Sequence, residues 1–82
     1  MKSERQNEID GNYDYFQRNL TMLLTDHEGE FALIRERRVV DFYQDVGTAF
    51  REGLSKFDDR LFSVQKVTRE PVELGNVSIA LA

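Results

Sequence analysis

Hydrophobic side chains follow two different spacings along the chain, and the order of these spacings predicts the elements. Apolar residues recur at helical spacing within 13–24 and again within 46–57. Between these stretches, 31–34 and 39–43 are short runs rich in β-branched and aromatic side chains, and 61–67 is a third such run. The predicted order is therefore helix, strand, strand, helix, strand, which is the order of a small α+β domain.

Local signals predict where these elements begin and end. Asn12 and Asp45 each precede a helical stripe and are expected to be N-caps, while Gly29 is expected to end the first helix. Gly53 lies on the apolar stripe of the second helix, where the missing side chain would allow a close approach to the sheet. The charged residues 35–38 join the first two strands as a hairpin. They lack the Asn-Gly signature of a tight turn, so the sequence leaves the turn type open.

The elements are expected to build two helices packed on one face of a three-stranded sheet, around a single core. The first two strands are predicted to be antiparallel. A right-handed crossover through the second helix would place the third strand parallel to the second or to the first, and the sequence leaves both orders open. The predicted core consists of Phe16, Leu20, Leu23, Phe31, Leu33, Val40, Phe42, Phe50, Leu54, Phe57, Phe62 and Val64.

The two ends of the chain differ in composition from the middle. Residues 1–11 are mostly polar and are expected to form a flexible leader, followed by a single domain over 12–67. Residues 68–82 form a tail in which Pro71 excludes a central strand. The tail also carries a period-2 apolar pattern, which predicts a fourth strand, an arm on a neighbouring subunit or a disordered end. The apolar positions of this pattern are Val77, Ile79 and Leu81.

Several short segments resemble a known family. These are Tyr13-Asp14-Tyr15-Phe16, Gly29-Glu30-Phe31, Arg38-Val39-Val40-Asp41-Phe42, the helical segment 48–54 and the final run 61–67. In this order they resemble the DUF5678 domains, a small uncharacterised family of bacteria and archaea. The resemblance covers roughly two thirds of the chain and implies the same α-β-β-α-β order. It implies no activity, cofactor or binding residue, because none is established for the family.

Length and composition exclude several classes of function. A chain of 82 residues makes one domain, and without cysteine it has neither disulfides nor a thiolate metal site. No apolar run approaches the ~18 residues that span a bilayer, and the polar N-terminus lacks the apolar centre of a signal peptide. We therefore expect a cytoplasmic protein without a membrane partner. The net charge of −4 disfavours binding to duplex nucleic acid.

The residues that could carry chemistry do not form a recognisable catalytic or metal site. His27 lies between Asp26 and Glu28, but side chains adjacent in sequence do not converge on one ion, so a solvated helix end is expected. The acidic pair 58–59 lacks the spacing of a calcium loop. An enzyme would require Asp26, His27 or Glu28 to approach Asp41 or Asp58 in a cleft. We expect no catalytic residue, metal or cofactor, and no small-molecule ligand is evident.

Two surfaces are candidates for an interaction. Arg35, Arg37 and Arg38 are predicted to form a positive patch at the hairpin, and Tyr15 lies off the apolar stripe of its helix. A three-stranded sheet also has two edges, which either acquire a partner or are protected. The leading hypothesis is a non-enzymatic module that binds a protein partner or itself through a sheet edge and the C-terminal tail. The alternative is a weak single-stranded nucleic-acid binder that uses the arginines.

Overall fold

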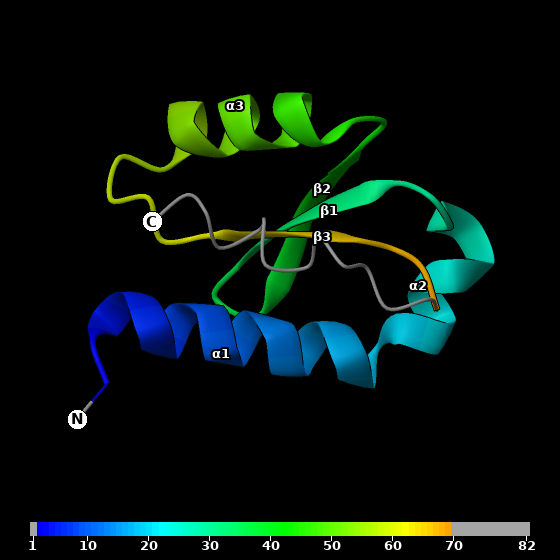
Figure 1. Ribbon diagram of the computed structural model, residues 1–82, viewed down its shortest axis with the longest axis horizontal. Helices are drawn as coiled ribbons and strands as arrows, with labels where there is room; N and C mark the ends of the chain where they lie inside the picture. Colours follow the sequence, from blue (N-terminus) through cyan, green and yellow to red (C-terminus); the bar gives the residue numbers. More distant parts are fainter. Residues whose placement is uncertain (1, 70–82) are drawn as a thin grey trace.

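The computed structural model describes residues 2–69 and confirms the small α+β domain and the order of its elements (Figure 1). The elements are α1 (Glu4–Arg18), α2 (Leu20–His27), β1 (Phe31–Arg35), β2 (Arg38–Tyr43), α3 (Val46–Lys56) and β3 (Ser63–Lys66). Most of the predicted tail, including its three alternating apolar residues, lies outside the described part of the chain.

The prediction of a flexible leader is wrong, because residues 4–11 belong to α1. The N-cap is Ser3, whose side chain accepts a hydrogen bond from the backbone of Gln6 at 3.1 Å, whereas Asn12 lies inside the helix. The helix ends at Asn19, whose side chain donates to the Tyr15 carbonyl at 2.8 Å, and α2 begins at the next residue. The polar leader lacked an apolar stripe, so its helicity could not be read from hydrophobic spacing.

The sheet has the order β2-β1-β3, with β1 antiparallel to both neighbours. The predicted hairpin of β1 and β2 is confirmed. Because β2 and β3 both run opposite to β1, they run in the same direction, as the crossover through α3 requires. They do not pair, however, since β1 lies between them. In the described domain β2 is therefore an edge strand.

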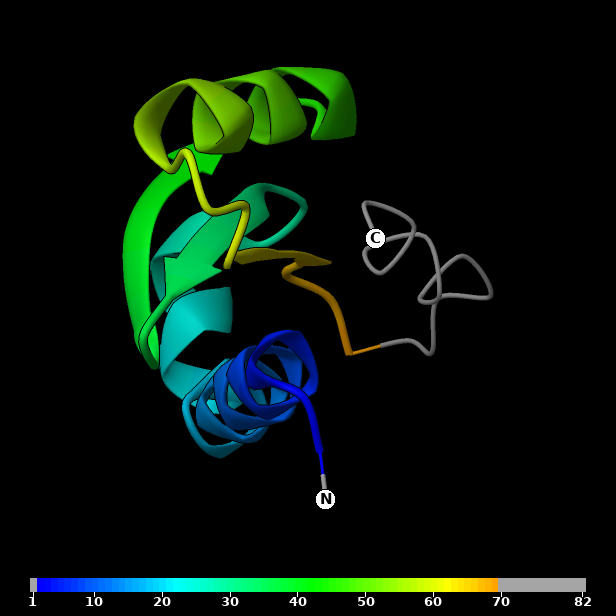
Figure 2. The ribbon, with the colours of Figure 1, turned by 90° about the vertical axis from the view of Figure 1, so that its left-hand side faces the viewer.

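The helices lie on both faces of the sheet, so the prediction of two helices on one face is wrong. Figures 1 and 2 show α3 on one side of the sheet and α1 and α2 on the other. The reason lies in β1, where Ala32 and Ile34 face α1 and α2 while Leu33 faces α3. A central strand that is buried on both faces has consecutive apolar residues rather than an alternating pattern. The four apolar residues 31–34 are such a run.

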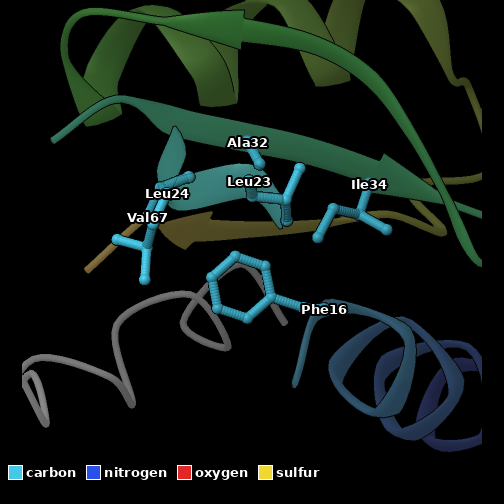
Figure 3. Close-up of a cluster of buried hydrophobic side chains, with 6 residues drawn as sticks. All are labelled: Phe16, Leu23, Leu24, Ala32, Ile34 and Val67. Atoms are coloured by element: carbon cyan, nitrogen blue, oxygen red, sulfur yellow. The ribbon is translucent and has the colours of Figure 1, made fainter. Parts of the chain in front are cut away.

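The domain therefore has two cores, separated by the sheet, instead of the single core that was expected. The core on the side of α1 and α2, shown in Figure 3, consists of Phe16, Leu23, Leu24, Ala32, Ile34 and Val67. The core on the side of α3 consists of Leu33, Ala49, Phe62 and Val64. Two predicted core residues are wrong, because Val40 and Leu54 are 41% and 40% exposed.

Helix α3 packs closely on the sheet, as its sequence predicts. The carboxylate of Asp45 accepts a hydrogen bond from the backbone of Thr48 at 2.9 Å, which confirms Asp45 as the N-cap. The predicted close approach at Gly53 is also confirmed. A Cβ atom at Gly53 would lie only 2.6 Å from the ring of Phe62, so the ring occupies the space that any larger residue would need.

Candidate functional site

The turn of the β1–β2 hairpin is a tight two-residue turn built from unusual residues. Arg35 pairs with Arg38, so only Glu36 and Arg37 lie between the strands. Both have positive φ angles, 52° and 62°, which is the conformation of a type I′ turn. Glycine and asparagine normally occupy such positions, because the left-handed conformation costs other residues roughly 1–2 kcal/mol each. Other contacts must therefore hold this turn in place.

Helix α1 supplies these contacts. The Glu36 amide donates to Oε2 of Glu8 at 2.7 Å, and the Arg37 amide donates to Oδ1 of Asn12 at 2.8 Å. Glu8 and Asn12 are one turn apart on α1, so they lie on the same face of the helix. We call the four groups, two side chains and two amides, the hairpin clamp.

Asn12 is the centre of the hairpin clamp because it is fully buried and bonds three parts of the fold. Its side chain is 0% exposed. Its Nδ2 lies within hydrogen-bond distance of Glu8 Oε2 (3.0 Å), the Ile34 carbonyl (3.1 Å) and Ser63 Oγ (3.3 Å). Asn12 thus joins α1 to β1, to the hairpin turn and to the start of β3. This network also explains why the polar residues of the predicted leader form an ordered helix.

The side chain of Arg35, one of the three candidate arginines, is held by contacts within the domain. Its guanidinium bonds both carboxylate oxygens of Asp59, at 2.7 and 3.0 Å, and the Leu61 carbonyl at 3.1 Å. It also lies over the ring of Phe57, 4.5 Å from the centroid. The hydrogen bonds from Arg35 lower the pKa of Asp59 to about 2, and those to Asp59 raise the pKa of Arg35. Its charge is therefore neutralised by the loop before β3.

The other two arginines differ from Arg35 and from each other. The guanidinium of Arg37 lies against α1 at Gly11, where an added Cβ atom would come within 2.7 Å of it. Arg38 is exposed at the start of β2 and, within the described domain, forms no hydrogen bond or ion pair through its side chain. The structure therefore does not bring the three side chains together as one positive patch.

His27 lies at the opposite end of the hairpin and is more enclosed than the predicted solvated helix end. Its ring stacks on Phe42, with 3.5 Å between centroids and 2° between planes. Its Nδ1 is 2.7 Å from Glu30 Oε1, and the other oxygen of Glu30 accepts from Gln44 at 3.1 Å. These contacts attach the end of α2 to β1 and β2. Sequence spacing missed them because Phe42 and Gln44 lie far along the chain from His27 and Glu30.

Asp41, one of the residues that the enzyme hypothesis would bring to His27, is bonded within its own strand. Its carboxylate accepts a hydrogen bond from the Phe42 amide at 2.8 Å. Within residues 2–69, no group of three histidine or acidic side chains is arranged to hold a metal ion. His27 and Glu30, with Phe42 and Gln44, thus attach the end of α2 to the sheet.

Tyr15 is not the exposed aromatic residue that its place off the apolar stripe suggested. It is half-buried and packs against the core on the side of α1 and α2. The strongly exposed apolar residues of α1 and α2 are instead Tyr13 and Met22, at 51% and 62%. Val40 on β2 and Val46 and Leu54 on α3 are exposed as well. Exposed apolar side chains therefore lie on β2 itself and on α3, the helix that packs against it.

Comparison with known proteins adds no functional assignment: no family model, curated protein or solved structure matches this chain. The resemblance to the DUF5678 family therefore stays a prediction. None of the helices in the described range combines the length and apolar character needed to cross a bilayer.

Replacing Asn12 with alanine tests the hairpin clamp. The Asn12→Ala variant should lower the free energy of unfolding by about 2–3 kcal/mol, because it leaves buried partners of the side chain without hydrogen bonds. Urea denaturation followed by circular dichroism measures this loss. Asn7→Ala, at an exposed position of the same helix, is the matched control and should change stability little. Equal stability of the two variants would contradict the role given to Asn12.

The ion pair of Arg35 and Asp59 predicts a specific pH dependence. The pKa of Asp59 is lowered to about 2, against roughly 3.9 in an unfolded chain. A lowered pKa stabilises the fold above the unfolded value, and this stabilisation is lost as the pH falls from about 4 to about 2. The Asp59→Asn variant should therefore have a lower melting temperature than the wild type at neutral pH, and this difference should disappear as the pH falls from about 4 to about 2. A difference in melting temperature that is unchanged at pH 2, or that Asp58→Asn also shows, would contradict the role given to the ion pair.

Proposed function

We propose that this chain is a non-enzymatic protein-interaction module that binds a protein partner, or a second copy of itself, through a sheet edge and the C-terminal tail. Strand β2 carries the main support, because it is an edge strand beside exposed apolar side chains. An added strand obtains its affinity from main-chain hydrogen bonds and its specificity from alternating side chains.

The chemistry of the edge supports binding of a particular strand better than indiscriminate pairing. A β-bulge interrupts the pairing of β2 with β1 opposite Leu33 and Ile34, and Val40 is the extra residue. Arg38 and Asp41 add charges on either side of Val40. Bulges and charges are the usual means by which an edge strand avoids random association. A partner must therefore match these charges.

The tail supplies the second part of the proposal through its sequence. Val77, Ile79 and Leu81 alternate with Asn76, Ser78 and Ala80, so one face of an extended tail would be apolar. Such a segment suits strand addition to a sheet, in this chain or in its partner.

Deletion of residues 70–82 tests the proposal. Self-association, measured by light scattering, or recovery of a partner from cell extract should be lost in the shortened chain. A milder variant carries Val77→Ser, Ile79→Ser and Leu81→Ser and should give the same result without shortening the chain. Its matched control carries Asn76→Ser and Ala80→Ser on the other face and should associate normally. Unchanged size and partner recovery in the shortened chain would contradict the proposal.

The alternative function is weak binding to single-stranded nucleic acid, and the exposed side chain of Arg38 together with Arg37 favours it. Binding of a labelled oligonucleotide should then fall steeply with salt and be lost in the double variant Arg37→Glu, Arg38→Glu. Asp59 already neutralises Arg35, so Arg35→Glu is not a suitable probe of this function. The absence of binding at low salt would exclude the alternative.

A further inference from the structure

The hydrogen bonds of the sheet identify which groups of β2 face its free edge. The Val67 amide donates to the Glu30 carbonyl at 2.8 Å, so the carbonyl of Glu30 points towards β3. The main-chain groups of successive residues point to opposite edges of a strand, so those of Ala32 and Ile34 also point towards β3. Their opposite residues on β2 are Phe42 and Val39. The main-chain groups of these two residues therefore point away from β1, to the free edge.

The Phe42 amide is already occupied, since it donates to the carboxylate of Asp41 at 2.8 Å. This contact protects the edge in the isolated chain, because a second strand needs the same amide. Asp41 would have to release the amide before another strand could pair there. An arginine on the incoming strand would favour that release by offering the carboxylate a stronger, charged partner.

Strand β2 itself carries such an arginine, Arg38. Arg38 lies opposite Arg35 on β1, and Asp41 lies opposite Leu33, so Arg38 and Asp41 are both on the α3 face of the sheet. Arg35 is neutralised by Asp59, whereas the side chain of Arg38 has no partner within the described domain. Opposite charges on neighbouring strands attract, so an acidic group beside the unpaired Arg38 would be stabilising.

We propose that the free edge of β2 pairs antiparallel with β2 of a second copy of this chain, with Asp41 of each copy moving from the Phe42 amide to Arg38 of the other. In this register Val39 of one copy exchanges hydrogen bonds with Phe42 of the other, and a two-fold axis repeats the pair. Asp41 then lies diagonal to Arg38 across the interface, on the same face and within reach of its long side chain. This inference rests on the proposed function and names its partner.

The apolar side chains of β2 agree with this register. Val39 and Phe42 both pack against the core on the side of α1 and α2, so the two residues that would pair across the axis lie on the same face. A Val–Phe pair is a favourable cross-strand pair. The two sheets would join into one, in the order β3-β1-β2-β2-β1-β3, and the two bulges would face each other across the axis.

Charge reversal tests the pairing directly. Sedimentation equilibrium of the full chain should show a concentration-dependent dimer. Arg38→Asp alone and Asp41→Arg alone should each weaken dimerisation by about tenfold or more, since each places like charges together twice per dimer. The double variant Arg38→Asp, Asp41→Arg restores opposite charges and should recover the dimer. Asp58→Arg and Arg60→Asp, in the exposed loop after α3, are the matched controls and should dimerise normally.

The outcomes separate this inference from the proposed function. A dimer that tolerates both single reversals but is lost on deletion of 70–82 would overturn the β2 pairing and leave the proposed function standing. A chain that stays monomeric at every concentration would also overturn the pairing. Weakening by either reversal without recovery in a folded double variant, as judged by circular dichroism, would show that Arg38 and Asp41 do not meet and would count against it.

Discussion

The buried side chain of Asn12 is the interaction on which the rest of the structure depends. It is the point where α1, the hairpin turn and β3 meet, and all of its hydrogen-bonding groups lie away from water. A buried amide is costly when it lacks partners and gives a specific geometry when it has them. Together with Glu8 it holds two left-handed residues in the turn, and this fixes the register of β1 and β2. The edge strand in turn depends on that register.

The position of β1 explains the layers of the fold. Because it is the middle strand, it is covered by α1 and α2 on one face and by α3 on the other. Within residues 2–69, β2 is therefore paired on one side only. The main-chain groups of Val39 and Phe42 face that open side, and Arg38 and Asp41 lie beside them. The free edge is thus a consequence of strand order, and its charges determine which strand fits it.

The sequence predicted the elements better than their arrangement. Regular spacing identified the strands and α3, and Asp45 and Gly53 were interpreted correctly, because each depends on local geometry. The start of α1 was missed, since its order comes from Asn12 and Glu8 contacting a turn far along the chain. The placement of α3 was missed because a short apolar run such as 31–34 does not by itself show that both faces of its strand are covered. The neutralisation of Arg35 was missed for the same kind of reason, because its partner Asp59 is 24 residues away.

The central claim is that the hairpin clamp is part of the stable core rather than a surface contact. Native-state hydrogen exchange of the Glu36 and Arg37 amides tests it most directly, since turn amides without a partner exchange rapidly and those in a core exchange only on global unfolding. Both turn amides should be protected to a similar extent as the amides of β1. Exchange at the rate of an exposed loop, while β1 remains protected, would contradict it.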